Sequence, residues 1–313
     1  MSSPPKPRRR GPDWWVCAAI FFLLVQLVLF VLPHVRRGVA GAWMWSFGGD
    51  SLLWMGLATI LLFLGFIWSL IRRPFWTGWR AVGVLLLLVL ALSSSLFRVY
   101  PSSHEGRVSA VRFRLPMDGP ITVAWGGDSL QGNYHVSYPD QRWAYDLLVV
   151  KDGQSHRGEG KELTDYYCYG LPALAPADGT VVFTRDTDPE MRIGELGGGT
   201  DPGGNQVVIE VAPGEYLILC HLQTGSVAVK VGDRVTAGQV VGKVGNSGNT
   251  SEPHLHIHLQ DGPPSDLMVE GIPLYFHDYR VNGQIVERGM PTGGVGETNW
   301  AGQVVEHAGP PKP

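Results

Sequence analysis

Three histidines alternate along the segment 253–259, which reads PHLHIHL. Successive side chains of a β-strand point to opposite faces of the sheet, so this spacing predicts that His254, His256 and His258 share one face. The aliphatic residues between them would pack into a core, and the imidazoles would line a groove. Three adjacent imidazoles resist protonation and each needs a partner, while imidazole is the commonest nitrogen ligand of metals. The segment therefore indicates a metal site.

Further ligands are expected from an upstream segment, 143–150 (WAYDLLVV), in which Asp146 is the only charged residue. Burying an unpaired carboxylate is costly, so Asp146 needs a cation. His135 precedes it by eleven residues. These two residues and one histidine of the HxH segment would leave one position of a tetrahedral zinc ion open to water, as catalytic zinc sites do. The remaining histidines could act as acid–base or oxyanion groups, and His221, at the end of a predicted strand, is the best placed.

The chain around these residues alternates short apolar or β-branched runs with Gly, Pro, Asp and Asn. Five runs predict strands, at residues 179–183, 206–211, 216–220, 239–244 and 255–259. No segment of ten or more residues after residue 107 keeps a helical period. We therefore expect an antiparallel all-β domain, a sheet or sandwich, at residues 116–277, with a loosely attached Gly/Pro-rich tail at 280–313. The glycine-rich stretch 194–204 predicts a plain loop, because no strand–loop–helix context surrounds it.

Several motifs of this domain occur in a specific order. They are 176–182 (PADGTVV), 204–209 (GNQVVI), His221-Leu222, 231–235 (VGDRV) leading to Gly238-Gln239, 245–250 (GNSGNT) and 253–256 (PHLH). In these motifs the domain resembles the M23 family of zinc metallopeptidases, the lysostaphin- and LytM-like endopeptidases. The resemblance implies a LytM-like β-fold of the duplicated-hybrid type and one Zn²⁺ per chain. It also implies that His256 and Asp146 are zinc ligands and that His254 and His221 are catalytic side chains.

One position departs from the family pattern. The family usually places its first ligand four residues before the Asp, where this chain has Arg142, and a guanidinium cannot bind zinc. A variant pattern, Asn-x-His followed by Gln-x-x-Ala-x-Asp, is matched by Asn133, His135, Gln141, Ala144 and Asp146. His135 is therefore the expected first ligand, with His104 and His156 as alternatives and a degenerate site as the remaining one. His258 stands where the family often has an acidic or polar residue, and we expect it to support the site rather than bind the metal.

The first hundred residues have a different character. They carry ten Lys and Arg against two Asp, a net charge of +8, so that the remaining residues sum to −11. Apolar runs at 14–33, 51–71 and 81–97 predict three transmembrane helices within 14–98, since about 20 apolar residues cross a bilayer. Basic residues precede the first run and separate the second from the third, which predicts a cytoplasmic N-terminus, residues 1–13. The first run is interpreted as an uncleaved anchor, and the β-domain would then lie on the periplasmic or extracellular side of the inner or plasma membrane.

These features together predict a membrane-anchored zinc endopeptidase that hydrolyses stem or cross-bridge peptides of peptidoglycan through a zinc-activated water. The alternative is a catalytically inactive M23-like module that binds and regulates a cell-wall hydrolase, which would make that hydrolase a protein partner. A lipoyl or phosphotransfer carrier is disfavoured, because no lysine stands at a hairpin tip and phosphotransfer needs a cytoplasmic domain. The acidic exported half argues against nucleic acid as a partner. Cys168 and Cys220 either form a disulfide outside the cytoplasm or remain buried thiols.

Overall fold

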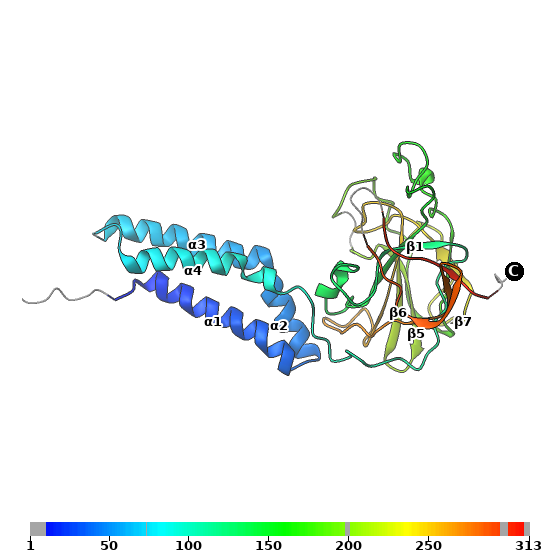
Figure 1. Cartoon of the computed structure of the whole chain (residues 1–313), viewed down its shortest axis with the longest axis horizontal. Helices are drawn as coiled ribbons and strands as arrows, with labels where there is room; N and C mark the ends of the chain where they lie inside the picture. Colours follow the sequence, from blue (N-terminus) through cyan, green and yellow to red (C-terminus); the bar gives the residue numbers. More distant parts are fainter. Residues whose placement is uncertain (1–10, 73, 198–200, 295–299, 310–313) are drawn as a thin grey trace, which may run out of the picture. The chain divides into compact units, whose positions relative to one another are not determined.

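The computed structural model describes residues 11–72, 74–197, 201–294 and 300–309. The chain divides into two compact units, Met1–Arg98 and Val99–Pro313 (Figure 1). The boundary agrees with the change from apolar to β-rich sequence. Most of the basic N-terminus expected at residues 1–13 lies outside the described residues.

The first unit is helical. It contains α1 (Trp14–Val35), α2 (Val39–Gly49), α3 (Ser51–Ile71) and α4 (Gly78–Leu92), which continues as the 3₁₀ turn η1 (Ser93–Leu96). Three of its helical segments, α1, α3 and α4 with η1, are long and apolar enough to cross a membrane. Helices of the predicted length and composition are therefore present in the three predicted segments. The short helix α2 was not expected from the sequence, because its eleven residues are too few to span a bilayer.

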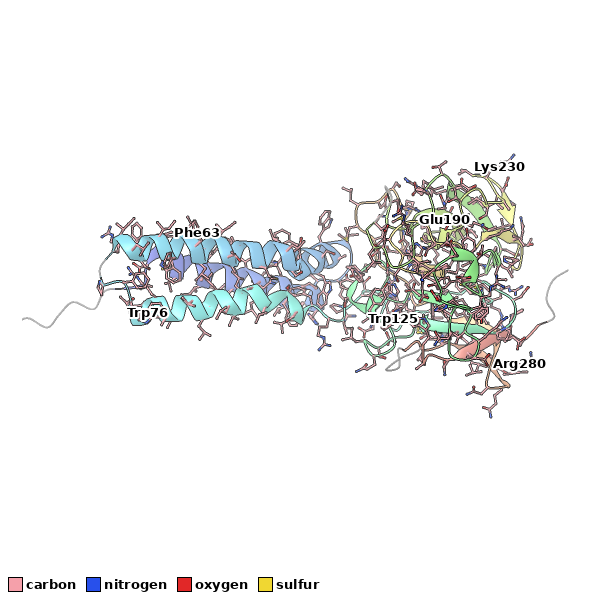
Figure 2. The ribbon with its side chains drawn as sticks, turned by 90° about the horizontal axis from the view of Figure 1, so that it is seen from above. Phe63, Trp76, Trp125, Glu190, Lys230 and Arg280 are labelled. Atoms are coloured by element: carbon pink, nitrogen blue, oxygen red, sulfur yellow. The ribbon has the colours of Figure 1, made fainter. Side chains whose placement is uncertain are left out.

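Small residues and one buried ion pair hold these helices together. The Trp15 ring packs against Gly65 of α3 and Gly83 of α4, where an added Cβ would lie 2.7 and 2.4 Å from ring atoms. Arg80 is 4% exposed, and its Nε donates to Asp13 Oδ2 at 2.6 Å. The outer surface of the bundle carries large apolar side chains such as Phe63 and Trp76 (Figure 2). An apolar exterior around a satisfied polar contact is typical of helices that face lipid.

The second unit is built on antiparallel strands. The ten-stranded sheet has the order β11-β10-β12-β1-β2-β9-β6-β5-β4-β7, and β3 pairs separately with β8. The strands are β1 (Ile121–Trp125), β2 (Tyr145–Leu148), β3 (Pro172–Leu174), β4 (Gly179–Arg185), β5 (Asn205–Ala212), β6 (Glu215–Leu222), β7 (Arg234–Val235), β8 (Val240–Lys243), β9 (Leu255–Gln260), β10 (Phe276–Val281), β11 (Gln284–Gly289) and β12 (Val304–His307). Neighbouring strands of both sheets run antiparallel, which confirms the predicted all-β class.

The five predicted strands correspond to β4, β5, β6, β8 and β9. The C-terminal region differs from its interpretation as a loosely attached tail. There β11 pairs with β10, and β12 lies between β10 and β1, with Val305 opposite Ile121. Val305 is fully buried, so part of the segment 280–313 completes the sheet and its core. Its strands are only four to six residues long and are rich in polar residues, which hides their period in the sequence.

One face of the central strands packs into the hydrophobic core. On β9, Leu255, Ile257 and Leu259 are at most 1% exposed and belong to this core. The alternating histidines therefore lie on the opposite face, as the strand period predicts. That face, over β2, β9 and β6, carries the candidate site.

Candidate metal centre

The site begins with a cross-strand pair. In the antiparallel pairing of β2 with β9, Asp146 stands opposite His256, and on the other side of β9 His256 stands opposite Cys220 of β6. Directly opposite side chains on one face lie close together. His256 Nδ1 accordingly lies 2.8 Å from Asp146 Oδ1. The sheet register thus joins two residues that are 110 positions apart in the sequence.

His135 comes from a short 3₁₀ turn, η2 (Tyr134–Ser137), that precedes β2. Asn133 caps this turn: its Oδ1 accepts the His135 backbone N–H at 3.1 Å and lies 2.9 Å from His135 Nδ1. The Asn133 amide donates to the carbonyls of Gly127 and Ala144, so the oxygen faces His135. A carbonyl oxygen only accepts, and therefore Nδ1 carries the hydrogen. Nε2 of His135 therefore carries a lone pair, and it lies 3.5 Å from Asp146 Oδ2.

His135, Asp146 and His256 form a compact set of potential ligands. Their ligand atoms all lie within 4.8 Å of one another, and all three residues are buried. Burial raises the pKa of Asp146, but the neighbouring imidazoles of His135, His254 and His256 outweigh it and hold the pKa well below its usual value. Two imidazole nitrogens and one charged carboxylate match the donors of a catalytic zinc site. The residues present therefore fit a zinc ion.

The two alternative histidines lie elsewhere. His104 Nε2 is 3.0 Å from Asp261 Oδ2, in a second cluster that also contains Glu270. The His156 ring packs against Tyr166, with ring centroids 5.3 Å apart. Of the three candidates for the first ligand, His135 is the one that the fold brings to Asp146.

Arg142 has a structural environment of its own. The residue is 3% exposed, its Nη2 pairs with Asp128 at 2.9 Å, and its Nε donates to the Tyr100 carbonyl at 3.1 Å. The guanidinium also lies over the Trp143 ring, 4.8 Å from its centroid. Arg142 occupies the position where the family usually has its first ligand. Here it holds its segment against Tyr100 and is not part of the ligand set.

His221 reaches the site through a break in the strand pattern. Asn205 pairs with Leu222 and Val207 pairs with Leu219, so that Gln206 opposes two residues of β6. This is a β-bulge, and within it His221 adopts φ 60°, in the left-handed region. The bulge turns His221 to the same side as Cys220, whereas simple alternation would send it to the opposite face. Its Nδ1 lies 2.8 Å from the Ser247 carbonyl and must donate to it, which leaves Nε2 without a hydrogen.

His254 lies beside His221, with ring centroids 4.7 Å apart. Its Nδ1 lies 2.8 Å from the Glu252 carbonyl, to which it donates, and its Nε2 lies 3.5 Å from Asp146 Oδ1. Burial lowers the pKa of His254, but the charge of Asp146 and hydrogen bonds with Asp146 and Glu252 raise it above the usual value overall. The pKa of His221 is well below its usual value because of burial and the nearby imidazoles. Without a bound metal, the pKa values of these two neighbouring histidines are therefore shifted in opposite directions.

Two glycines explain why the loops around His221 approach so closely. A Cβ added to Gly204 would lie 2.4 Å from the Ser247 carbonyl carbon, and one added to Gly248 would lie 2.5 Å from the Gly204 nitrogen. The loops are in backbone contact, which requires residues without side chains. The same loops supply both partners of His221, because Gly203 O accepts its backbone N–H and Ser247 O accepts its Nδ1–H.

The pocket over the site encloses about 110 Å³. Its lining residues are Tyr134, His135, Gln141, Pro202, Gly203, Cys220, His221, Asn249 and His256. Tyr134, Cys220 and Asn249 were not predicted as site residues, because no spacing or motif marks these side chains individually as functional. Burial and the Asp146 carboxylate raise the pKa of the Tyr134 phenol, so it stays protonated as a hydrogen-bond donor. Cys168 and Cys220 are both free, because Cys168 belongs to the core and Cys220 to the opposite face of the sheet.

The model of the family described as Peptidase family M23 matches residues 161–267. The chain contains a peptidase family M23 domain. The matched region includes His221, His254 and His256, whereas His135 and Asp146 precede it. The M23 domain is 30% identical over 158 residues to the peptidoglycan DD-endopeptidase ShyA of Vibrio cholerae, covering 47% of this chain and 32% of that protein. It is also 30% identical over 94 residues to the cell division protein DipM of Caulobacter vibrioides, covering 30% of this chain and 13% of that protein.

The chain thus spans about a third or less of the length of these curated relatives. Among solved structures, the M23 domain is similar to the catalytic domain of lysostaphin from Staphylococcus simulans, with 23% identity, a TM-score of 0.29 and coverage of 48% of this chain and 86% of that one. A zinc-containing peptidase from Vibrio cholerae matches with 20% identity, a TM-score of 0.33 and coverage of 52% and 38%.

Proposed function

We propose that this chain is a membrane-anchored zinc endopeptidase that cleaves peptides of peptidoglycan. The observation that carries the proposal is the buried group of His135, Asp146 and His256, with His221 and His254 beside it. Two imidazoles and a carboxylate form an open ligand set, and two further imidazoles provide acid–base groups. The match to peptidase family M23 supports hydrolysis of a peptide bond as the reaction.

In this proposal His135 binds the metal through Nε2, His256 through Nδ1, and Asp146 through its carboxylate. Asn133 holds the His135 ring in the tautomer that such binding requires. When bound, Zn²⁺ would polarise the scissile carbonyl and lower the pKa of the attacking water. The pocket borders His135 and His256 and would admit water to a metal held there.

His221 is the proposed general base. Its Nδ1 hydrogen is donated to the Ser247 carbonyl, and its lowered pKa keeps Nε2 unprotonated near neutral pH. An unprotonated nitrogen in the pocket can accept a proton from the attacking water. The bulge in β6 and the contact between the two glycine loops position this nitrogen.

His254 is the proposed proton donor. Its raised pKa favours a ring with hydrogens on both nitrogens, and the Glu252 carbonyl accepts one of them. The Nε2 hydrogen can then bond to the oxygen on which negative charge develops and later pass to the leaving amine. Two neighbouring groups whose pKa values are driven apart are typical of an acid–base pair.

Peptidoglycan is proposed as the substrate because ShyA, a relative of the M23 domain, is named a peptidoglycan DD-endopeptidase. The basic flanks of the apolar helices favour an M23 domain outside the cytoplasm, on the side where the cell wall lies. Helices that stay in the membrane would keep the enzyme beside this substrate.

The alternative, an inactive module that regulates a cell-wall hydrolase, rests on the arginine at position 142. A lost ligand would leave the site incomplete. His135 supplies an imidazole in its place, and Arg142 is engaged by Asp128 and Tyr100. The complete set of His and Asp side chains therefore favours the enzyme.

The test combines metal content and activity. Purified protein in detergent would be analysed for zinc, and its digestion of isolated peptidoglycan would be followed by mass spectrometry of the released peptides. We expect about one zinc per chain, as for mononuclear catalytic sites, and new peptide termini. Asp146→Ala should lose both. Folded wild-type protein that binds zinc but releases nothing from peptidoglycan would favour the regulatory module, and folded protein without zinc would contradict the enzyme.

A further inference from the structure

Three buried polar side chains, those of His256, His258 and Gln260, form an unbroken line of hydrogen bonds. His256 Nε2 lies 3.0 Å from His258 Nδ1, and His258 Nε2 lies 3.1 Å from Gln260 Oε1. The Gln260 amide nitrogen in turn donates to the Gly262 carbonyl at 2.7 Å. All three side chains alternate along β9, on the face that carries the site, and each is at most 6% exposed. The line therefore runs from the interior of the protein to the candidate ligand.

The direction of every hydrogen bond in this line is fixed at its far end. A backbone carbonyl only accepts, so Gln260 must turn its NH₂ group to Gly262 and its oxygen to His258. That oxygen also only accepts, which places the hydrogen of His258 on Nε2 and leaves Nδ1 as an acceptor. His256 must then donate to it from Nε2.

The near end of the line is the atom that a metal would use. With its hydrogen on Nε2, His256 keeps the lone pair of Nδ1, which lies 2.8 Å from Asp146 Oδ1. Two acceptor atoms at that distance favour a cation beside them, so this tautomer suits a metal-bound site. The opposite tautomer would direct a hydrogen, rather than a lone pair, at the ligand set. One peptide carbonyl, Gly262 O, thus determines the ring form of a residue six positions away.

We propose that His258 and Gln260 are positioning residues of the metal centre, which hold the hydrogen of His256 on Nε2 and so present its Nδ1 lone pair to Zn²⁺. This inference rests on the proposed function, because it takes His256 as a zinc ligand. Groups that bond to a ligating histidine fix its tautomer and raise its basicity, and their loss typically weakens metal binding by about 10–100-fold.

A purely structural role for these residues gives a different expectation. Buried polar side chains need partners wherever they lie, so breaking the line would destabilise the fold in either case. Only a positioning role also changes the affinity for zinc and the tautomer of His256. The test must therefore measure these two quantities beside stability.

Four variants of the full chain in detergent micelles separate the roles. His258→Leu removes the middle of the line, and Gln260→Leu removes the oxygen that orients it. His258→Gln keeps an acceptor and a donor in the same order. Ile218→Ala is the matched control, because Ile218 stands opposite His258 on β6, is 3% exposed and contributes only packing. The dissociation constant of Zn²⁺ would be measured by competition with a chelator, and the imidazole tautomers by ¹⁵N NMR of histidine-labelled protein.

We expect both leucine variants to raise the zinc dissociation constant by about 10–100-fold, and His258→Gln and Ile218→Ala to stay within about threefold of wild type. The ¹⁵N spectrum of the wild type should show His256 protonated on Nε2, and Gln260→Leu should show mixed tautomers. Folded His258→Leu with wild-type zinc affinity would overturn the inference, and so would His256 protonated on Nδ1. A wild type that binds no zinc would instead overturn the proposed function, and the tautomer spectrum would still decide where the hydrogen of His256 lies.

Discussion

His135 Nε2 and Asp146 Oδ2 lie 3.5 Å apart, although one residue comes from a 3₁₀ turn and the other from the middle of a strand. The Asp146 carboxylate faces two further imidazoles, and its charge is the centre of the whole cluster. Neutralising this charge should have a larger effect on metal binding than any change in packing around it.

Asp146→Asn should therefore abolish zinc binding, because an amide oxygen is a much weaker zinc ligand than a carboxylate. We expect zinc content measured by atomic absorption to fall from about one per chain to below about 0.1. Asp140→Asn is the matched control: Asp140 is a nearby carboxyl whose burial raises its pKa, and it is not part of the ligand set. Equal zinc loss in both variants would contradict the assignment of Asp146.

The choice of the first ligand is tested by comparing His135→Ala with His156→Ala. The first substitution removes a nitrogen from the ligand set, whereas the second removes a ring that packs on Tyr166. We expect the zinc dissociation constant to rise at least about 100-fold in the first variant and to stay unchanged in the second. Retention of zinc by His135→Ala would show that another group completes the site.

Arg142 should matter for stability and not for metal binding. Arg142→Ala breaks the contacts with Asp128 and with the buried Tyr100 carbonyl, which we expect to lower the free energy of unfolding by roughly 1–3 kcal/mol. The zinc content of the folded variant should equal that of wild type. Chemical denaturation and zinc analysis of the same sample check both statements, and zinc loss without a change in stability would contradict them.

The stability of metal-stripped protein should fall as the pH is lowered from about 6.5 towards 4. Burial lowers the pKa of His135 from 6.5 to about 4, against a partial opposing effect of the Asp146 charge. Between these values the unfolded chain binds a proton that the folded protein does not, so unfolding is favoured as pH falls. The contribution of this group is roughly 3 kcal/mol at the acid end.

Denaturant titrations from pH 7.5 to 4.5 would measure the slope of the free energy of unfolding against pH. His135→Gln should reduce this slope by the contribution of one titrating group, because glutamine does not titrate. The raised pKa of His254 has the opposite effect above pH 6.5, because there the folded protein holds a proton that the unfolded chain has lost. The free energy of unfolding should therefore rise less steeply with pH above 6.5 than below it. A His135→Gln variant with an unchanged slope would contradict the lowered pKa.

Gly204→Ala should separate the two loops that hold His221. The new Cβ would lie 2.4 Å from the Ser247 backbone. Because the clash is with backbone atoms, it cannot be relieved by rotation of a side chain. We expect a loss of stability of about 1–3 kcal/mol and reduced peptidase activity, with zinc retained. Gly214→Ala is the control, since Gly214 also has a positive φ but nothing lies within 4 Å of its added Cβ. If both variants behave alike, the contact between the loops is unimportant.

The alternation of apolar and polar residues in the sequence was sufficient to predict the central strands and the common face of His256 and His258. On these strands apolar residues alternate with polar ones, and burial on one side leaves no other register. The position of Asp146 also followed, because a lone carboxylate in an apolar strand needs a partner wherever the strand lies.

Other features could not be predicted, because they depend on contacts between segments that are distant in the sequence. The bulge at His221 adds one residue to β6 and turns the side chain, although the local sequence continues the strand. The strand β12 is recognisable only by its pairing with β1, more than 170 positions earlier. Arg142 appears as a lost ligand in the sequence, and its contact with Tyr100 becomes visible only when the two segments are brought together.

The left-handed backbone of His221 sets thermostability against the proposed catalytic role of this residue. Such a conformation costs a non-glycine residue about 1–2 kcal/mol, and glycine adopts it freely. Selection for a more heat-resistant protein would therefore favour His221→Gly, which removes the proposed base while relaxing the chain. A histidine that persists there under selection for heat resistance would do so for its imidazole, at the expense of the fold that carries it.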